Sequence, residues 1–246
     1  MELEQAVAGL YRTFSSYRMP EHVDMSPYRD PEKAIGALRR KPLRELNAED
    51  LNYYAATAIT TVGDENLFKY ALPRLLELVN KGDMLTDSEI VMGKLSVGSW
   101  RGWPDEEQEV VSEFMMAWWL DTLKNDPTHV SVDSVLVSFA QAGENLSAYL
   151  NWWDMHPSPT ATDQLAVYIV ELWDGEAGEL NLNNAFLEGH PAQVQQIRSW
   201  LLRPAILQRL EQGQLSALER GVDDEQYAHY AWAIEILRIL LPQGAP

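Results

Sequence analysis

The sequence predicts an all-α protein built of antiparallel helix pairs. Helix-start signals recur along the chain, apolar residues with helical spacing follow them, and the one segment rich in β-branched residues also fits a helical pattern. The chain has 246 residues, 46% of them hydrophobic, which suffices for one large domain or two small ones. We expect a single all-helical domain over residues 1–246, more than half helical and without a sheet of three or more strands. An α-solenoid (HEAT-like) array is one arrangement that such helix pairs form.

Two kinds of helix start recur. Proline is tolerated at the first helical position, because the N–H that it lacks has no partner inside the helix. Candidate starts of this kind are Asp30-Pro31, Trp103-Pro104, Ser158-Pro159 and His190-Pro191. The second kind is a capping side chain followed three residues later by a carboxylate, which together satisfy free amides at the helix end. This pattern occurs at Asn47–Asp50, Thr86–Glu89 and Ser216–Glu219.

Apolar residues follow these starts at helical spacing, which predicts helices that face a core. The two clearest stripes comprise Phe68, Leu72, Leu75, Leu76 and Val79, and, near the end of the chain, Tyr227, Tyr230, Ala231, Ile234, Leu237 and Leu241. Between residues 110 and 120, apolar residues cover most of the helix circumference, which is typical of a helix packed on two sides. We therefore expect a central helix there, with Trp118 and Trp119 buried.

Two segments are less regular. Residues 129–139 are rich in β-branched residues and partly alternate, which makes them a candidate strand. A helical template fits their apolar residues better, and no adjacent segment offers a pairing partner, so we expect a helix. Residues 174–189 are rich in glycine, asparagine and acidic residues, which indicates a long loop with one short helical turn.

A structural repeat is a further hypothesis. Glycines at positions 63, 102, 143 and 221 separate apolar segments by 39, 41 and 78 residues. The segment Glu65-Asn-Leu-Phe-Lys-Tyr70 also returns as Glu144-Asn-Leu-Ser-Ala-Tyr149. These spacings are close to the unit of about 40 residues found in helix-pair arrays. Chance is the alternative, because fourteen glycines can be chosen to form many such series.

A series of short segments lies between residues 14 and 79. It comprises Phe14-Ser-Ser-Tyr17, Pro42-Leu-Arg-Glu-Leu46, Glu49-Asp-Leu51, Tyr54, Ala58-Ile-Thr-Thr-Val-Gly-Asp64 and Tyr70-Ala-Leu-Pro-Arg-Leu-Leu-Glu-Leu78. The series resembles an uncharacterised family of bacterial all-helical proteins. Members of that family commonly carry a short cysteine cluster where this chain has Met25-Ser-Pro-Tyr28. The resemblance therefore implies a helical fold and a bacterial cytosolic origin, but no metal, redox or catalytic residue.

The charge is negative and unevenly distributed. The chain has 37 acidic and 19 basic residues, a formal net charge of −18, and residues 82–197 hold nineteen of the acids but three of the bases. Between Lys124 and Arg198 no lysine or arginine occurs. Nucleic acids and anionic membranes are bound through basic side chains, so this distribution argues against both as partners. It favours a basic protein or a cationic ligand.

Motifs for catalysis or metal binding are absent from the sequence. The chain has no cysteine, which excludes disulfides, iron–sulfur clusters, thiolate zinc sites and cysteine nucleophiles. Its closest two histidines are 27 residues apart, and neither a phosphate-binding loop nor a nucleophile elbow occurs. Two His–acid pairs, Glu225 with His229 and Asp154 with His156, are more simply surface ion pairs or loop hydrogen bonds. We expect no cofactor and no bound transition metal.

The cellular location is predicted from two further observations. The first residues carry acids where a signal peptide has bases, and they lack a long apolar centre. No apolar run approaches the roughly 18 residues that a membrane span requires. We therefore expect a cytoplasmic protein.

Aromatic residues accompany acids within the acid-rich segment. The candidate binding residues are Trp152, Trp153, Asp154, His156, Trp173 and Asp174. Indole faces beside carboxylates suit a cationic ligand or a basic peptide. The alternative is that the indoles belong to the core and the acids to a solvated face. Neighbouring Trp152 and Trp153 point about 100° apart on a helix, so one can pack inward while the other does not.

We expect a non-enzymatic interaction or scaffold protein that presents this acidic, aromatic-rich surface, because helix pairs without a catalytic motif usually act through a surface. The alternative is an enzyme or small-molecule-binding protein with a pocket assembled from Trp, Tyr, Asp and His of several helices. A concave acidic surface would favour the first function. A closed pocket with convergent polar groups would favour the second.

Overall fold

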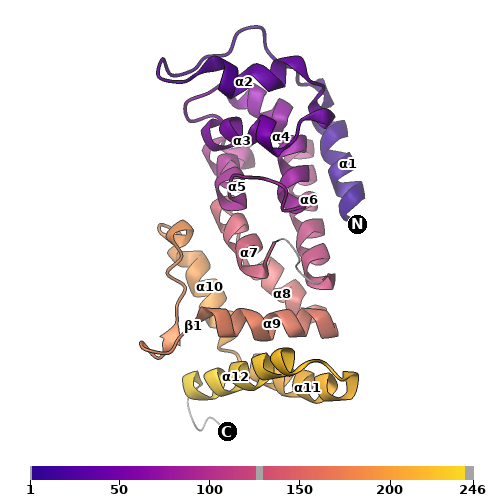
Figure 1. Cartoon of the computed structure of the whole chain (residues 1–246), viewed down its shortest axis with the longest axis vertical. Coiled ribbons are helices and arrows are strands. Elements are labelled where there is room, and N and C mark those ends of the chain that lie inside the picture. Colours follow the sequence, from indigo (N-terminus) through magenta and orange to yellow (C-terminus); the bar gives the residue numbers. More distant parts are fainter. Residues whose placement is uncertain (1, 126–129, 242–246) are drawn as a thin grey trace. The chain divides into compact units, whose positions relative to one another are not determined.

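The structure is a computed structural model that describes residues 2–125 and 130–241 (Figure 1). This described part is 71% helical and holds twelve α-helices, four short 3-10 helices and a single two-stranded sheet. The all-α prediction is therefore confirmed. The chain divides into two compact units, Met1–Asp121 with Thr128–Glu144, and Thr122–Pro127 with Asn145–Pro246. The expectation of a single domain over residues 1–246 stays a prediction.

All the regular elements in the described part of the first unit are helices, which loops and two isolated β-bridges connect. Its elements are α1 (Leu3–Thr13), η1 (Phe14–Ser16), α2 (Pro31–Arg40), η2 (Leu43–Glu45), α3 (Ala48–Thr57), α4 (Glu65–Asn80), α5 (Ser88–Val97), η3 (Trp100–Gly102), α6 (Asp105–Lys124), of which the residues to Asp121 belong to this unit, and α7 (Val132–Gln141). Helix α2 packs on α3, α1 on α4, and α5 on α7. Helices α3 and α4 also contact α5, so α5 is central to this unit.

Large aromatic side chains fill the core of the first unit. Trp118 and Trp119 on α6 are at most 1% exposed, as their spacing predicted, and both rings meet Phe139 of α7 edge to face. Phe139 lies in the segment for which the sequence left a strand as the rival to a helix. The helix prediction is confirmed from Val132 onward, and His129 lies outside the described residues.

Helix starts follow the predicted local signals at most positions. Helices α2, α9 (Pro159–Leu172) and α10 (Pro191–Leu201) begin at the predicted prolines, and α6 begins one residue after Pro104. Asn47 and Asp50 form a reciprocal capping box at the start of α3. Local hydrogen bonds of the capping residues account for these boundaries.

One of the predicted starts is wrong, and another is displaced by one residue. Ser216–Glu219 lies inside α11 (Pro204–Arg220), because the same four-residue pattern also fits a continuous helix. Helix α5 begins at Ser88, and Thr86 donates its hydroxyl to the Asn52 side chain at 2.6 Å instead of capping α5.

The second unit contains most of the remaining elements. They are α8 (Ser147–Met155), α9, β1 (Trp173–Asp174), β2 (Glu179–Leu180), η4 (Ala185–Leu187), α10, α11 and α12 (Asp224–Leu240). Helices α9, α11 and α12 pack on one another, and α10 packs on α8 (Figure 1). The predicted irregular segment 174–189 contains most of the β1–β2 hairpin and one helical turn, η4. In residues 2–125 and 130–241, no helix is long and apolar enough to cross a membrane.

Helices α11, α9 and α12 approach closely at Gly213 of α11. A Cβ atom built on Gly213 would lie 2.6 Å from Cε1 of Tyr230 on α12 and 2.7 Å from Cγ2 of Thr162 on α9. Both neighbours are buried, at 0% and 4% exposure, so neither can move aside easily. Glycine is therefore required where the three helices meet, in spite of its low helix propensity.

We predict that Gly213→Ala lowers the free energy of unfolding by about 1–3 kcal/mol, because overpacking outweighs the gain of about 1 kcal/mol in helix propensity. Urea unfolding of the full chain measures the change. Gly178→Ala is unsuitable as a control, since Gly178 has a positive φ. Gln214→Ala on the same helix is the matched substitution and should change the free energy by less than about 0.5 kcal/mol. A Gly213→Ala variant as stable as the native protein would contradict the packing argument.

Candidate functional site

The predicted binding residues on α8 divide between surface and core. Trp152 stacks on the exposed His156 ring, with centroids 4.5 Å apart. Trp153 is fully buried, donates its indole N–H to the Ala161 carbonyl oxygen and stacks on Trp200 at 5.0 Å. A partner at the surface can therefore reach the Trp152–His156 stack but not Trp153.

The predicted acids in this region have local structural partners. Asp154 accepts hydrogen bonds from Trp200 Nε1 at 2.9 Å and from Arg203 at 3.1 Å. Asp174 accepts from the backbone N–H groups of Glu176 and Ala177, both at 3.0 Å, and so closes the β1–β2 turn. Each carboxylate has a local structural role, which accounts for its position without a ligand.

The remaining predicted residue, Trp173, is half-buried in strand β1 opposite Leu180. Among the described residues, no hydrogen bond, ion pair or ring contact joins Trp173 or Asp174 to the Trp152–His156 stack. The described residues also contain no cluster of three or more His, Cys, Asp or Glu side chains suited to a metal ion. A ligand-binding role for the six predicted residues stays a prediction.

The most deeply buried charge in the first unit is Lys69 of α4, a residue that the sequence did not single out. Its side chain is 4% exposed, and Nζ lies 2.8 Å from Glu107 Oε2 on α6 and 2.6 Å from Glu65 Oε1. The ammonium also lies 4.4 Å from the centre of the Trp103 ring. Tyr17 completes the cluster by donating its hydroxyl to Glu107 Oε1 at 2.6 Å.

The protonation of this cluster follows from its contacts. Burial by itself would lower the pKa of Lys69, but Glu107 and Glu65 raise it above its ordinary value. Burial and the hydrogen bond to Glu107 raise the pKa of Tyr17. Lys69 is therefore charged and Tyr17 neutral at pH 7. Because Lys69 forms ion pairs with both Glu65 and Glu107 within the cluster, we assign it a structural role rather than a catalytic one.

A second polar cluster surrounds Glu77 on α4. Its carboxylate accepts from the Tyr11 hydroxyl and from Arg74, both at 2.7 Å, and from Lys81 at 3.0 Å. Arg44 lies over the Tyr11 ring, 3.6 Å from its centre. Burial would raise the pKa of Glu77, but the three hydrogen bonds lower it to about 2. A hollow of 640 Å³ lies beside this cluster, but Glu77 is already bound by three donors and offers little to a ligand.

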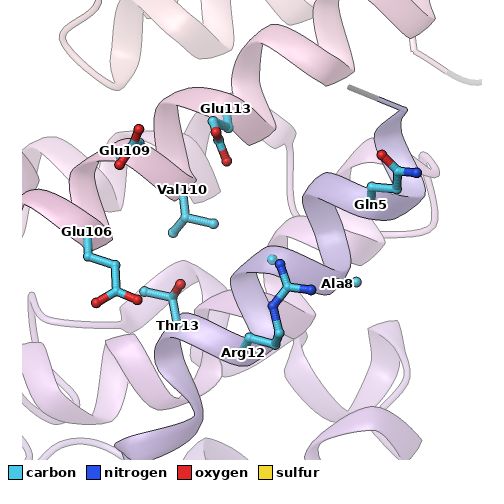
Figure 2. A pocket seen from close by; sticks show the side chains of 9 residues that line it. Gln5, Ala8, Arg12, Thr13, Glu106, Glu109, Val110 and Glu113 are labelled. Carbon is cyan, nitrogen blue, oxygen red and sulfur yellow. The ribbon is translucent and has the colours of Figure 1, made fainter.

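An open groove between α1 and α6 differs, because its acids form no ion pair within the part of the chain that the structure describes. The groove has a volume of 610 Å³ (Figure 2). Its lining residues are Gln5, Ala8, Gly9, Arg12, Thr13, Glu106, Glu109, Val110 and Glu113. Figure 2 shows the three glutamates along α6, with Gln5, Arg12 and Thr13 on α1 across from them. We refer to this site as the α1–α6 groove.

Small residues form the floor of the α1–α6 groove. A Cβ atom at Gly9 would lie 3.1 Å from Val110 Cγ2, so the two helices are close there. Glu106, Glu109 and Glu113 recur at i, i+3 and i+7 and therefore share one face of α6. All three are exposed, and within the described residues none of them forms an ion pair. The groove thus has one wall of hydrated carboxylates that can pair with cations.

The sequence indicates which acids of α6 are buried and which are exposed. Asp105, Glu106 and Glu107 form the acidic first turn of α6. Glu107, however, also shares the apolar row of Val110, Val111 and Phe114 at i, i+3, i+4 and i+7, which indicates burial. Glu106 and Glu109 lie outside that row.

Comparison with protein-family models, curated proteins and solved structures finds no match to this chain. The resemblance of the segments between residues 14 and 79 to a bacterial helical family therefore stays a prediction. The site has to be interpreted from its own chemistry.

We predict that Lys69→Met lowers the free energy of unfolding by about 3–5 kcal/mol, because it leaves the Glu107 carboxylate buried without its cation. Urea unfolding measures this, with Lys33→Met as the control at an exposed lysine. The double variant Lys69→Met, Glu107→Gln should be more stable than Lys69→Met alone, since it removes the stranded charge. Equal costs for Lys69→Met and Lys33→Met would contradict the structural role.

Glu77 gives a prediction of pH dependence. Its pKa is lowered from 4.5 to about 2 on folding, so its contribution to stability is present above pH 4.5 and is lost as the pH falls toward 2. Wild type should therefore be more stable than Glu77→Gln at pH 7, and this difference should shrink between pH 4.5 and 2. Unfolding curves at fixed pH values measure the difference. A difference that stays constant over this interval would contradict the assignment.

Proposed function

We propose that this protein is a non-enzymatic interaction protein that binds a basic segment of a partner protein in the α1–α6 groove. The observation that carries the proposal is the row of three exposed glutamates without ion-pair partners in the part of the chain that the structure describes. As expected from the sequence, the proposed function is that of an interaction protein, and the proposed partner is basic. The proposed site differs in location, because the acids near Trp152 and Trp173 already bind neighbouring groups.

The geometry of the α1–α6 groove suits an elongated basic segment. The groove is open along the helices, and its carboxylates are spaced at one helical turn, so successive lysine or arginine side chains can each pair with one of them. Arg12 on the opposite wall has donors for the carbonyl oxygens of the bound segment. Residues 82–197, which include all three glutamates, hold nineteen acids and three bases, and this charge favours the approach of a cationic partner.

The predicted solenoid-like arrangement of helix pairs belongs to the same proposal. Of the four glycines in the predicted series, Gly63, Gly143 and Gly221 have a positive φ and lie just before α4, α8 and α12, whereas Gly102 lies in η3 without a positive φ. The segment that begins at Glu65 starts together with α4, and the related segment that begins at Glu144 lies just before α8. These recurring boundaries support a repeating helix-pair unit of the kind that presents extended binding surfaces.

We predict that Glu109→Gln, Glu113→Gln weakens binding of a fluorescent peptide of alternating lysine and alanine by about fivefold at 10 mM salt, because two exposed ion pairs are lost. Fluorescence anisotropy of the full chain measures the affinity. Raising the salt to 150 mM should also weaken binding, since the screening length falls from about 30 Å to about 8 Å.

The matched control is Glu176→Gln, Glu188→Gln, which removes the same charge from exposed positions in the acid-rich segment. It should weaken binding by less than about twofold, through the long-range field alone. A peptide of alternating glutamate and alanine should not bind. If both double variants weaken binding equally, net charge and not the groove is responsible, and the proposal is wrong.

A further inference from the structure

The last two helices of the second unit, α11 and α12, carry exposed apolar side chains. Four of the eight large hydrophobic residues that are well exposed in the described chain lie on them, Leu215 and Leu218 on α11 and Trp232 and Ile239 on α12. Each of the four is at least 56% exposed. Single exposed apolar residues are ordinary, whereas several on neighbouring helices indicate an interaction surface.

On α12, the exposed residues lie opposite the side that packs into the unit. The buried residues Tyr230, Ala233 and Leu237 share one side of the helix, toward α9 and α11. Trp232, Glu235 and Ile239 recur at i, i+3 and i+7 and share the other side. The apolar stripe of α12 is therefore interrupted by one carboxylate, and within the described residues Glu235 forms no ion pair.

An ion pair connects the exposed surfaces of α11 and α12. Arg238 Nη2 on α12 lies 2.6 Å from Glu211 Oε1 on α11, and the two side chains are 60% and 43% exposed. Glu211 shares its face of α11 with Leu215 and Leu218, because the three recur at i, i+4 and i+7. The apolar residues of both helices thus border the same ion pair. We call this surface the α11–α12 face.

We propose that the α11–α12 face binds a second copy of the chain, so that the protein forms a symmetric dimer. In a two-fold contact the same surface meets itself, and every contact occurs twice. An antiparallel contact of two α12 helices, centred midway between residues 232 and 239, brings Trp232 beside Ile239 of the second copy. The same contact brings Glu235 beside Arg238 of the second copy. The face therefore complements itself in its apolar residues and in its charges.

The size of the α11–α12 face sets the expected strength of the dimer. Both helices have 17 residues and are therefore about 25 Å long, and two helices side by side are about 20 Å wide. Such a face covers about 500 Å², less than the roughly 800 Å² per partner of a standard interface. We therefore expect a reversible dimer, in which Leu215 and Leu218 extend the contact between the α12 helices.

The net charge of the chain gives this dimer a characteristic salt dependence. Two chains with a net charge of −18 repel each other, and salt screens the repulsion. Dimerisation through the α11–α12 face should therefore strengthen as salt rises, whereas binding of a basic segment in the α1–α6 groove should weaken. Because the two salt dependences are opposite, either proposal can fail without the other.

The test is sedimentation equilibrium of the full chain at 10 and 150 mM salt. We expect a 28.0 kDa monomer in equilibrium with a dimer, and tighter association at 150 mM. Trp232→Glu should raise the dimer dissociation constant at least about tenfold, because it places a carboxylate in the apolar contact of both copies. Leu215→Glu, on the other helix, should also raise it. The matched control is Leu85→Glu, which adds the same charge at an exposed leucine of the first unit and should change the constant less than about twofold.

Glu235→Arg distinguishes the α11–α12 face from a general effect of charge. It removes one negative charge and adds one positive charge, so the net charge changes from −18 to −16, which by itself favours self-association. In the proposed contact, however, it places a second guanidinium beside Arg238 of the other copy, so we expect dimerisation to weaken about threefold. Circular dichroism should show that all these variants stay folded, since each replaced side chain is exposed.

Three results would overturn the proposal. The first is a native chain that stays monomeric at about 0.2 mM protein and 150 mM salt, including one that associates only with a different protein. The second is a dimer that folded Trp232→Glu and Leu215→Glu leave intact, or that Leu85→Glu weakens equally. The third is a dimer that Glu235→Arg strengthens.

Discussion

The chain has nineteen basic side chains and thirty-seven acidic ones, so at most about half of the carboxylates can form an ion pair with a cation of their own. The positions of the cations determine which carboxylates are neutralised. A buried carboxylate without a partner is costly, whereas an exposed one keeps its hydration. Lys69 accordingly lies against the buried Glu107, and Arg74 and Lys81 both contact Glu77. The cations in these clusters neutralise acids within the fold, whereas Glu106, Glu109 and Glu113 on the surface of α6 form no ion pair within the described residues.

The Lys69–Glu107 pair and the buried apolar row beside it both favour the observed orientation of α6. Glu107 and the apolar row beside it are directed into the first unit, where the ammonium of Lys69 and the hydroxyl of Tyr17 hold the carboxylate. A rotation of α6 about its axis would pull Glu107 from these partners. The pair therefore holds the row of Glu106, Glu109 and Glu113 in the α1–α6 groove, so one helical segment both stabilises the fold and presents the proposed binding surface.

The helical class and most helix starts could be predicted because they depend on local hydrogen bonds and on periodicity. The Asn47 side chain caps α3 by accepting from the backbone N–H of Asp50, only three residues later. Trp118 is buried because its own helix is apolar on most sides. The start predicted at Ser216–Glu219 is wrong because the same four-residue pattern also occurs inside a continuous helix, here α11. Ile59 has a φ of 64°, rare for a β-branched residue, and nothing local in the sequence indicates it.

The candidate sites depend on contacts between residues far apart in the sequence, which composition and spacing do not determine. Lys69 and Arg209 resemble each other in sequence, because uncharged residues flank each of them within its helix. Packing separates them: two carboxylates and an indole ring surround Lys69, whereas Arg209 meets a carbonyl and a hydroxyl oxygen but no acid. The first arrangement is complete without a ligand. The second leaves one guanidinium nitrogen, Nη2, buried without a hydrogen-bond partner among the described residues, so packing satisfies the two cations to different degrees, and only the folded structure distinguishes them.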